Sequence, residues 1–215
     1  MITFWNTFVK ITGWLTEVIC FRPRVFYEDK QIQSKRIKGP AIIISNHTSV
    51  LDYVAILFVF FFRTVRAQMA EVLFEKKGLR ILLKWLGGIR VDRKAHDYGF
   101  VEKSKKILEK GGVVLVFPES RLPLPGEARP LPFVPSVAYL ALSSGVPVIP
   151  VYTNGSYFKK KRLSVLIGKP IDTLAYLDTS LSEKEQLARI SEKYRERIME
   201  LGDLLEEYEA KKAKK

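Results

Sequence analysis

Residues 41–52 read Ala-Ile-Ile-Ile-Ser-Asn-His-Thr-Ser-Val-Leu-Asp, and this stretch is the best guide to how the chain folds. The apolar run 41–45 predicts a buried strand, and residues 50–62 predict a helix. The turn between them places His47 five residues before the carboxylate of Asp52. A side chain that follows a buried strand lies at the mouth of the sheet, where the ligand sites of α/β proteins gather.

His47 and Asp52 leave two interpretations open. An imidazole titrates near neutrality, and a nearby carboxylate can hold its tautomer and stabilise the imidazolium, so the pair is suited to deprotonating a hydroxyl. Ser49-x-x-Asp52 also matches a capping box, in which the aspartate only satisfies a backbone N–H at a helix start. Residues five apart in one helix point about 140° apart. His47 is therefore expected in the turn before the helix, and Asp52 in its first turn.

Strands and helices alternate along the rest of the chain. This order predicts an α/β fold with a largely parallel central sheet flanked by helices. We divide the chain into an N-terminal helical segment, 1–38, and one domain, 39–215, which includes the C-terminal helix. The predicted strands are 65–70, 89–91, 113–117, 147–152 and 163–168, and the predicted helices are 77–86, 97–110, 137–143 and a final helix capped by Ser182-x-x-Glu185.

The composition limits the partners of the chain. Its 215 residues are 47% hydrophobic, enough for one substantial core. A formal net charge of +13 indicates an anionic partner, either phospholipid, nucleic acid or a phosphorylated small molecule. Zinc-finger spacing and RNA-recognition motifs are missing, so no nucleic acid is expected. The only cysteine, Cys20, excludes an internal disulfide, and two separated histidines predict no metal site.

The first twenty residues predict an amphipathic helix. Asn6, Lys10 and Glu17 interrupt its apolar series, which argues against a membrane-spanning helix, and the features of a signal peptide are missing. We expect the helix to lie on the cytoplasmic face of a membrane that contains anionic phospholipid, as a peripheral or monotopic element. The alternative is a helix packed on its own domain. The apolar series is Phe4, Trp5, Phe8, Ile11, Trp14, Leu15, Val18 and Ile19.

Three further segments fall at predicted strand ends, so in an α/β fold they can converge on His47. Arg93 and Arg121 each offer a planar donor fork to a phosphate, and Glu119 could accept from a substrate hydroxyl or orient an arginine. The proline-rich residues 122–135 follow as a loop at a strand end. The three segments are Gly88–Arg93, Phe117–Arg121 and Val148–Val151.

Together these segments resemble the four ordered motifs of a known family, the glycerolipid acyltransferases of the 1-acylglycerol-3-phosphate acyltransferase (PlsC) type. The resemblance covers about residues 40–170 and has one departure. Ser120 stands where the family has Gly-Thr, so Arg121 arrives one residue early. In order, Asn46–Asp52 is similar to a motif built on His-x-x-x-x-Asp, Gly88–Arg93 to a glycine, an apolar stretch and Asp-Arg, Phe117–Arg121 to Phe-Pro-Glu-Gly-Thr-Arg, and Val148–Val151 to an apolar run around a proline.

The resemblance implies an acyltransferase that moves an acyl group from acyl-CoA or acyl-carrier protein to the free hydroxyl of a lysophospholipid. The first acceptor it implies is 1-acylglycerol-3-phosphate, which would give phosphatidic acid. His47 would be the general base and Asp52 its charge partner, with no cofactor and no metal. Another lysophospholipid or lipid acceptor is the first alternative, and a basic membrane-binding or nucleic-acid-binding protein without enzymatic activity is the second. Substrate binding is assigned to Arg93, Glu119, Ser120 and Arg121.

The apolar run 54–62 follows the His/Asp motif and is well short of the roughly 20 residues that cross a bilayer. A buried helix is the simplest prediction for it. Its phenylalanines offer an alternative, because they could wall an apolar groove for an acyl chain. These residues are Phe58, Phe60, Phe61 and Phe62.

Overall fold

A computed structural model of the chain describes residues 1–21, 23–33, 35–92, 99–158 and 162–213. The predicted site residue Arg93 lies outside the described residues, as do His96, the lysines at 159–161 and the side chain of Cys20. Within the described residues the strands are β1 (Arg24–Tyr27), β2 (Ala41–Ser45), β3 (Val65–Ala70), β4 (Ile89–Val91), β5 (Val113–Val116), β6 (Val148–Thr153) and β7 (Ser164–Ile167). The α-helices are α1 (Ile2–Cys20), α2 (Asp52–Val59), α3 (Lys77–Leu86), α4 (Gly99–Glu109), α5 (Ser136–Ser144) and α6 (Glu183–Ala213), with short 3-10 helices η1 (Glu71–Phe74) and η2 (Thr173–Tyr176).

The strands form one sheet in the order β1-β7-β6-β2-β5-β3-β4. Five neighbouring strands run parallel, namely β6, β2, β5, β3 and β4. β7 pairs antiparallel with β6, and the edge strand β1 pairs parallel with β7. The predicted α/β class with a largely parallel sheet is therefore confirmed. The sequence did not predict β1, which places residues 24–27 of the N-terminal segment at the edge of the sheet.

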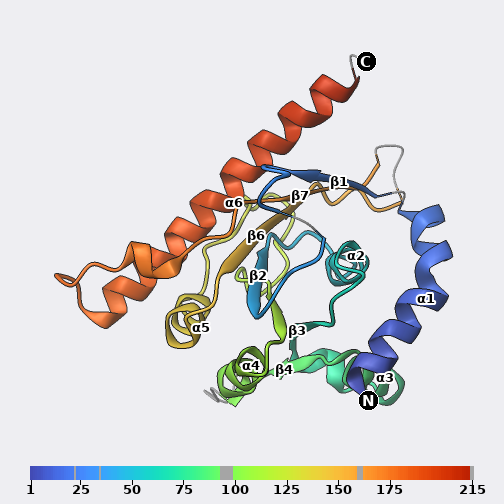
Figure 1. Ribbon diagram of the computed structural model, residues 1–215, viewed down its shortest axis with the longest axis horizontal. Coiled ribbons are helices and arrows are strands. Elements are labelled where there is room, and N and C mark those ends of the chain that lie inside the picture. Colours follow the sequence, from blue (N-terminus) through green and yellow to red (C-terminus); the bar gives the residue numbers. More distant parts are fainter. Residues whose placement is uncertain (22, 34, 93–98, 159–161, 214–215) are drawn as a thin grey trace.

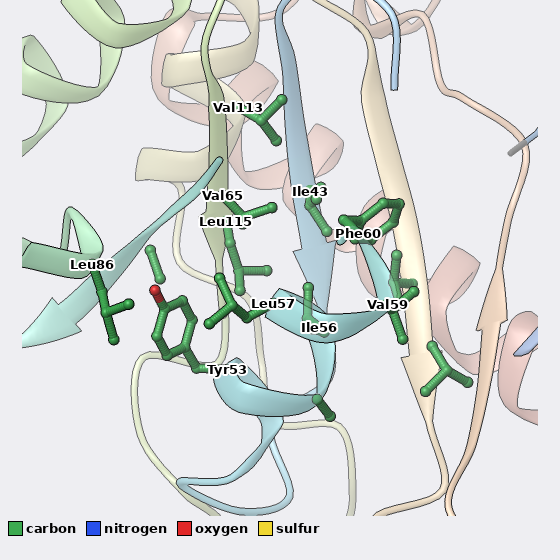
Figure 2. Packing of buried hydrophobic residues seen from close by; sticks show 14 of the residues in the cluster. Ile43, Tyr53, Ile56, Leu57, Val59, Phe60, Val65, Leu86, Val113 and Leu115 are labelled. Carbon is green, nitrogen blue, oxygen red and sulfur yellow. The ribbon is translucent and has the colours of Figure 1, made fainter. Parts of the chain in front are cut away.

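Helices cover both faces of the sheet, with α1, α2 and α3 on one side and α4, α5 and α6 on the other (Figure 1). The central strand β2 is buried on both faces, as expected for a parallel strand between two helical layers. Ile43 packs in the same cluster as Ile56 and Leu57 of α2, which turn toward the strands (Figure 2). Ile42 and Ile44 point the other way, toward the layer that contains α5 and α6.

The strand register brings the predicted motifs to one edge of the sheet. Ile44 of β2 pairs with Val116 of β5 and with Pro150 of β6. His47 and Glu119 each follow their strand by the same short distance beyond that paired level. Because β2 lies in the middle of the sheet, the turn after it is flanked by the ends of both neighbouring strands.

On α1 the charged and amide side chains are buried, whereas several large apolar side chains are exposed. Asn6, Lys10 and Glu17 are only 1%, 1% and 6% exposed. Lys10 donates to three backbone carbonyls just beyond the end of α2, at 2.6 to 3.1 Å, and burial lowers its pKa to about 8. None of the described helices is long and apolar enough to cross a membrane. The large apolar side chains of α1 that stay exposed are Phe4, Phe8, Ile11, Trp14, Leu15 and Ile19.

Candidate active site

Asp52 is the centre of the turn between β2 and α2. It is the first residue of α2, and its side chain is fully buried. Oδ2 accepts the backbone N–H groups of Thr48 and Ser49 at 2.6 and 2.8 Å and lies 3.0 Å from Nδ1 of His47. Oδ1 accepts the hydroxyls of Thr48 and Tyr157 at 2.9 and 2.6 Å. These donors stabilise the buried charge and hold the carboxylate in one orientation.

His47 lies between this carboxylate and the solvent. Its side chain is 18% exposed, and its ring stacks on Phe117 with 4.3 Å between the ring centroids. A carboxylate beside Nδ1 favours the tautomer that carries its proton there. Nε2 is then the nitrogen with a free electron pair, and the arrangement has the geometry of a general base with its charge partner.

The capping prediction is correct in one half and wrong in the other. Asp52 accepts the N–H of Ser49, as a capping box requires. The Ser49 hydroxyl, however, accepts from the N–H of Leu51, and the N–H of Asp52 donates to the carbonyl of Ser49. The reason is that α2 begins at Asp52, so this residue occupies the first helical position and not the third. Asp52 nevertheless both accepts N–H groups of the turn and faces His47, so a structural role and a role as charge partner are compatible.

Glu119 was predicted to meet a substrate hydroxyl or an arginine, but in the structure both of its oxygens accept backbone N–H groups. Oε1 accepts from His47 at 2.7 Å, and Oε2 accepts from Leu131 at 2.9 Å. The side chain is buried, and burial raises its pKa, although the two hydrogen bonds act against this rise. Glu119 therefore joins the His47 turn to the proline-rich loop.

Arg121 lies at the surface, directly after Ser120, whose φ of +64° is in the left-handed region. Its two terminal nitrogens donate to the two oxygens of Glu127, each at 2.7 Å. The hydrogen bonds from Arg121 lower the pKa of Glu127 to about 2, so the pair is charged throughout the neutral range. Sequence reasoning missed Glu127, because a proline-rich loop gives no signal for which of its side chains folds back. Arg121, which was predicted to bind a phosphate, is thus already paired with a carboxylate of the protein.

Two residues from the end of β6 and the loop after it complete the site. The Asn46 side chain exchanges two 2.9 Å hydrogen bonds with the backbone of Thr153 and so extends the β2–β6 ladder. Tyr157 reaches Asp52 from the same loop. Gly155 approaches so closely that a Cβ there would lie 2.6 Å from the hydroxyl oxygen of Thr48. Sequence reasoning missed Tyr157, and its only local signal was the turn-forming Asn-Gly pair just before it.

Comparison with known proteins places this site in a family. Residues 24–154, more than half of the chain, match a family described as Acyltransferase. The chain belongs to this acyltransferase family. It is 27% identical to human 1-acyl-sn-glycerol-3-phosphate acyltransferase beta, over 71% of the chain and 56% of that protein. It is 29% identical to a 1-acyl-sn-glycerol-3-phosphate acyltransferase of Limnanthes alba, over 67% of the chain and 51% of that protein.

The chain spans little more than half the length of the human and plant relatives that it matches. A Bacillus subtilis 1-acyl-sn-glycerol-3-phosphate acyltransferase is 26% identical over 63% of the chain and 67% of that protein. The crystal structure of PlsC, the 1-acyl-sn-glycerophosphate (LPA) acyltransferase of Thermotoga maritima, superimposes with a TM-score of 0.63. It covers 92% of this chain and 79% of that chain at 23% identity, which confirms the fold.

Proposed function

We propose that this acyltransferase moves an acyl group from an acyl thioester to the free hydroxyl of a lysophospholipid. The observation that carries the proposal is the 3.0 Å contact between Nδ1 of His47 and the fully buried carboxylate of Asp52, in a chain of the acyltransferase family. The relatives named above act, by their names, on 1-acyl-sn-glycerol-3-phosphate. This makes 1-acylglycerol-3-phosphate the first candidate acceptor and phosphatidic acid the product.

The proposed reaction is a direct transfer. Nε2 of His47 takes the proton of the acceptor hydroxyl while the oxygen attacks the thioester carbonyl. The new C–O bond forms, the C–S bond breaks, and the thiolate leaves and receives the proton from the imidazolium. Asp52 stabilises the imidazolium between these two steps. A thiolate is a good leaving group, so base assistance and a positioned acceptor are sufficient without an acylated side chain.

The acceptor phosphate is assigned to the arginines of the second and third motifs. Arg121, which follows Ser120 at the surface, provides a planar donor fork, and Arg93 is its proposed companion. Glu119 takes a positioning role, because both of its oxygens hold backbone N–H groups that fix the His47 turn. An incoming phosphate must displace Glu127 from the end of the Arg121 fork.

This displacement leads to a prediction for Glu127→Gln. The neutral amide competes less well for Arg121, so we expect the KM for 1-acylglycerol-3-phosphate to fall by about two- to fivefold, the scale of an exposed ion pair. The KM for an acceptor without phosphate, such as a monoacylglycerol, should not change. Initial rates at varied acceptor concentration provide the measurement. A higher KM for the phosphate acceptor alone would mean that Glu127 orients Arg121 for binding and does not compete.

The proposed partner surface is a membrane with anionic phospholipid, on its cytoplasmic face. α1 supports this proposal because large apolar side chains such as Phe4, Phe8 and Leu15 are exposed while its charged residues Lys10 and Glu17 are buried. α3 extends the apolar surface, since Trp5 and Trp85 stack at 4.2 Å and Ile81 is half exposed. Exposed basic residues on α3, among them Arg80 and Lys84, suit anionic lipid headgroups.

An apolar cavity of about 780 Å³ lies between α1, β1 and α2, and we assign it to an alkyl chain. Phe58, Phe61 and Phe62 line it, as the alternative interpretation of this run predicted. Phe60 does not, because it is fully buried in the core. Phe58 lies six residues after Asp52, which corresponds to about 9 Å along α2, and neither His47 nor Asp52 lines the cavity itself.

The test is release of free thiol from an acyl thioester in the presence of different acceptors. Acyl-CoA and acyl-carrier protein serve as donors, and the acceptors are 1-acylglycerol-3-phosphate, lysophospholipids with other headgroups and monoacylglycerol. We expect acceptor-dependent thiol release and a diacyl product, with 1-acylglycerol-3-phosphate as the best acceptor. Preference for another lysophospholipid would move the assignment within the same reaction. Thiol release that no acceptor accelerates would contradict acyl transfer to a lipid.

A further inference from the structure

Tyr157 makes the one long-range contact to the Asp52 carboxylate among the hydrogen bonds of the described residues. The other donors and the imidazole all come from residues 47–49, within the same turn. Tyr157 lies 105 residues further along the chain, and its hydroxyl donates to Oδ1 at 2.6 Å. Glu119 and Asn46 also tie this turn to the rest of the domain, but Tyr157 is the residue from outside the turn that bonds the carboxylate itself.

The surroundings of Tyr157 favour the protonated phenol, which can donate a hydrogen bond. The side chain is buried, and burial together with the charge of Asp52 raises the pKa of the phenol. The phenol therefore keeps its proton in the neutral range and donates it to Oδ1 of Asp52. A hydrogen bond to a charged carboxylate is stronger than one between neutral groups, and it lowers the proton affinity of the acceptor.

The ring of Tyr157 is held in turn by the end of the N-terminal helix. Phe21, the residue that closes α1, meets Tyr157 edge to face, with 5.5 Å between the ring centroids. Both rings are only 8% exposed, and both belong to the core cluster on the α2 side of the sheet. A line of direct contacts thus runs from α1 through Phe21 and Tyr157 to Asp52.

We infer that Tyr157 is a positioning residue for the reaction and that Phe21 links its position to the seating of α1 on the domain. The inference rests on the proposed function, in which His47 and Asp52 act as base and charge partner. Tyr157 touches no substrate in this scheme. It holds the orientation of the carboxylate that stabilises the imidazolium and supplies one of its hydrogen-bond donors, so its loss reaches the chemistry through Asp52.

The experiment compares Tyr157→Phe with Tyr194→Phe. We expect Tyr157→Phe to lower kcat about tenfold, the scale of one lost hydrogen bond to a charged group, with little change in KM. The acid limb of its pH–rate profile should move to higher pH, because a carboxylate with one donor fewer holds a proton on the imidazole more strongly. Tyr194→Phe removes an equally buried hydroxyl, 2.6 Å from that of Thr173 on the opposite face of the sheet, and should change neither.

The outcomes separate this inference from the proposed function. If His47→Ala is inactive and Tyr157→Phe keeps the wild-type kcat and pH profile, the function stands and the positioning role is overturned. A loss of kcat with an unmoved acid limb also overturns it, since a merely structural hydroxyl gives that result. Should Tyr157→Phe fail to fold, Phe21→Leu decides the matter. It leaves the hydroxyl in place, and we expect a smaller fall in kcat with the acid limb displaced in the same direction.

Discussion

His47→Ala should lower acyl transfer by about 10²- to 10⁴-fold, the range that a positioned general base contributes. The imidazole is mostly buried between Phe117 and Asp52, and removing it leaves the acceptor hydroxyl without a group to take its proton. The loss should appear in kcat at saturating acceptor, because no binding contact is assigned to the ring. Thiol release from acyl-CoA, measured with and without acceptor, gives the rate directly.

Two controls test whether the loss of activity is specific to the imidazole of His47. His96→Ala replaces the other histidine of the chain and should leave turnover unchanged. Sedimentation with anionic vesicles should show that His47→Ala still binds, because the apolar face of α1 does not include the site. Near-normal turnover in His47→Ala would remove the base assignment. If Cys20→Ala were the inactive variant, a covalent acyl-enzyme on that thiol would have to replace direct transfer.

The central strands and the His/Asp pair were predictable because both are local in sequence. A continuous apolar run such as 41–45 is typical of a strand covered on both faces, and the alternation of strands and helices predicts that such strands pair in parallel. β1 was not predictable in the same way. Its four residues are all only partly buried, so they carry neither a buried run nor an alternating pattern, and only pairing with β7 defines the strand.

The contacts that orient the site come from segments far apart in sequence, and spacing alone does not reveal them. The motif pattern identified Glu119 as functional. It did not reveal that the two oxygens of Glu119 accept N–H groups from His47 and from a loop twelve residues away. Arg121 was expected to face a ligand, but its guanidinium group instead donates to Glu127 of the same loop. In each case the partner is chosen by the fold of a loop, where side-chain direction does not follow a period.

The orientation of α1 on the domain also could not be predicted from the sequence alone. Its amphipathic period was evident, and a period alone does not say which face turns inward. Lys10 decides the question in the structure, because its ammonium group donates to three backbone carbonyls just beyond the C-terminal end of α2 and is buried there. The buried charges of Lys10 and Glu17 and the exposed rings of Phe4, Phe8 and Trp14 support the proposed contact of α1 with lipid.

Asp52→Asn isolates the charge of the carboxylate from its shape. An amide can keep its oxygen on the side that accepts the N–H groups of Thr48 and Ser49 and faces His47. Its NH₂ group then faces the hydroxyls of Thr48 and Tyr157, which can rotate and accept. The turn should therefore persist, and thermal unfolding should stay within a few degrees of the wild type.

Activity should nevertheless fall by about 100-fold or more, because a neutral amide no longer stabilises the imidazolium that forms when His47 takes the proton. Asp52→Ala is the matched comparison: it removes the charge and all the hydrogen bonds, so it should be as inactive and clearly less stable. If Asp52→Asn kept half of the wild-type kcat, the charge would have no part in the chemistry. Asp52 would then be a cap for α2 and nothing more, and the 3.0 Å contact with His47 would serve only to hold the ring in place.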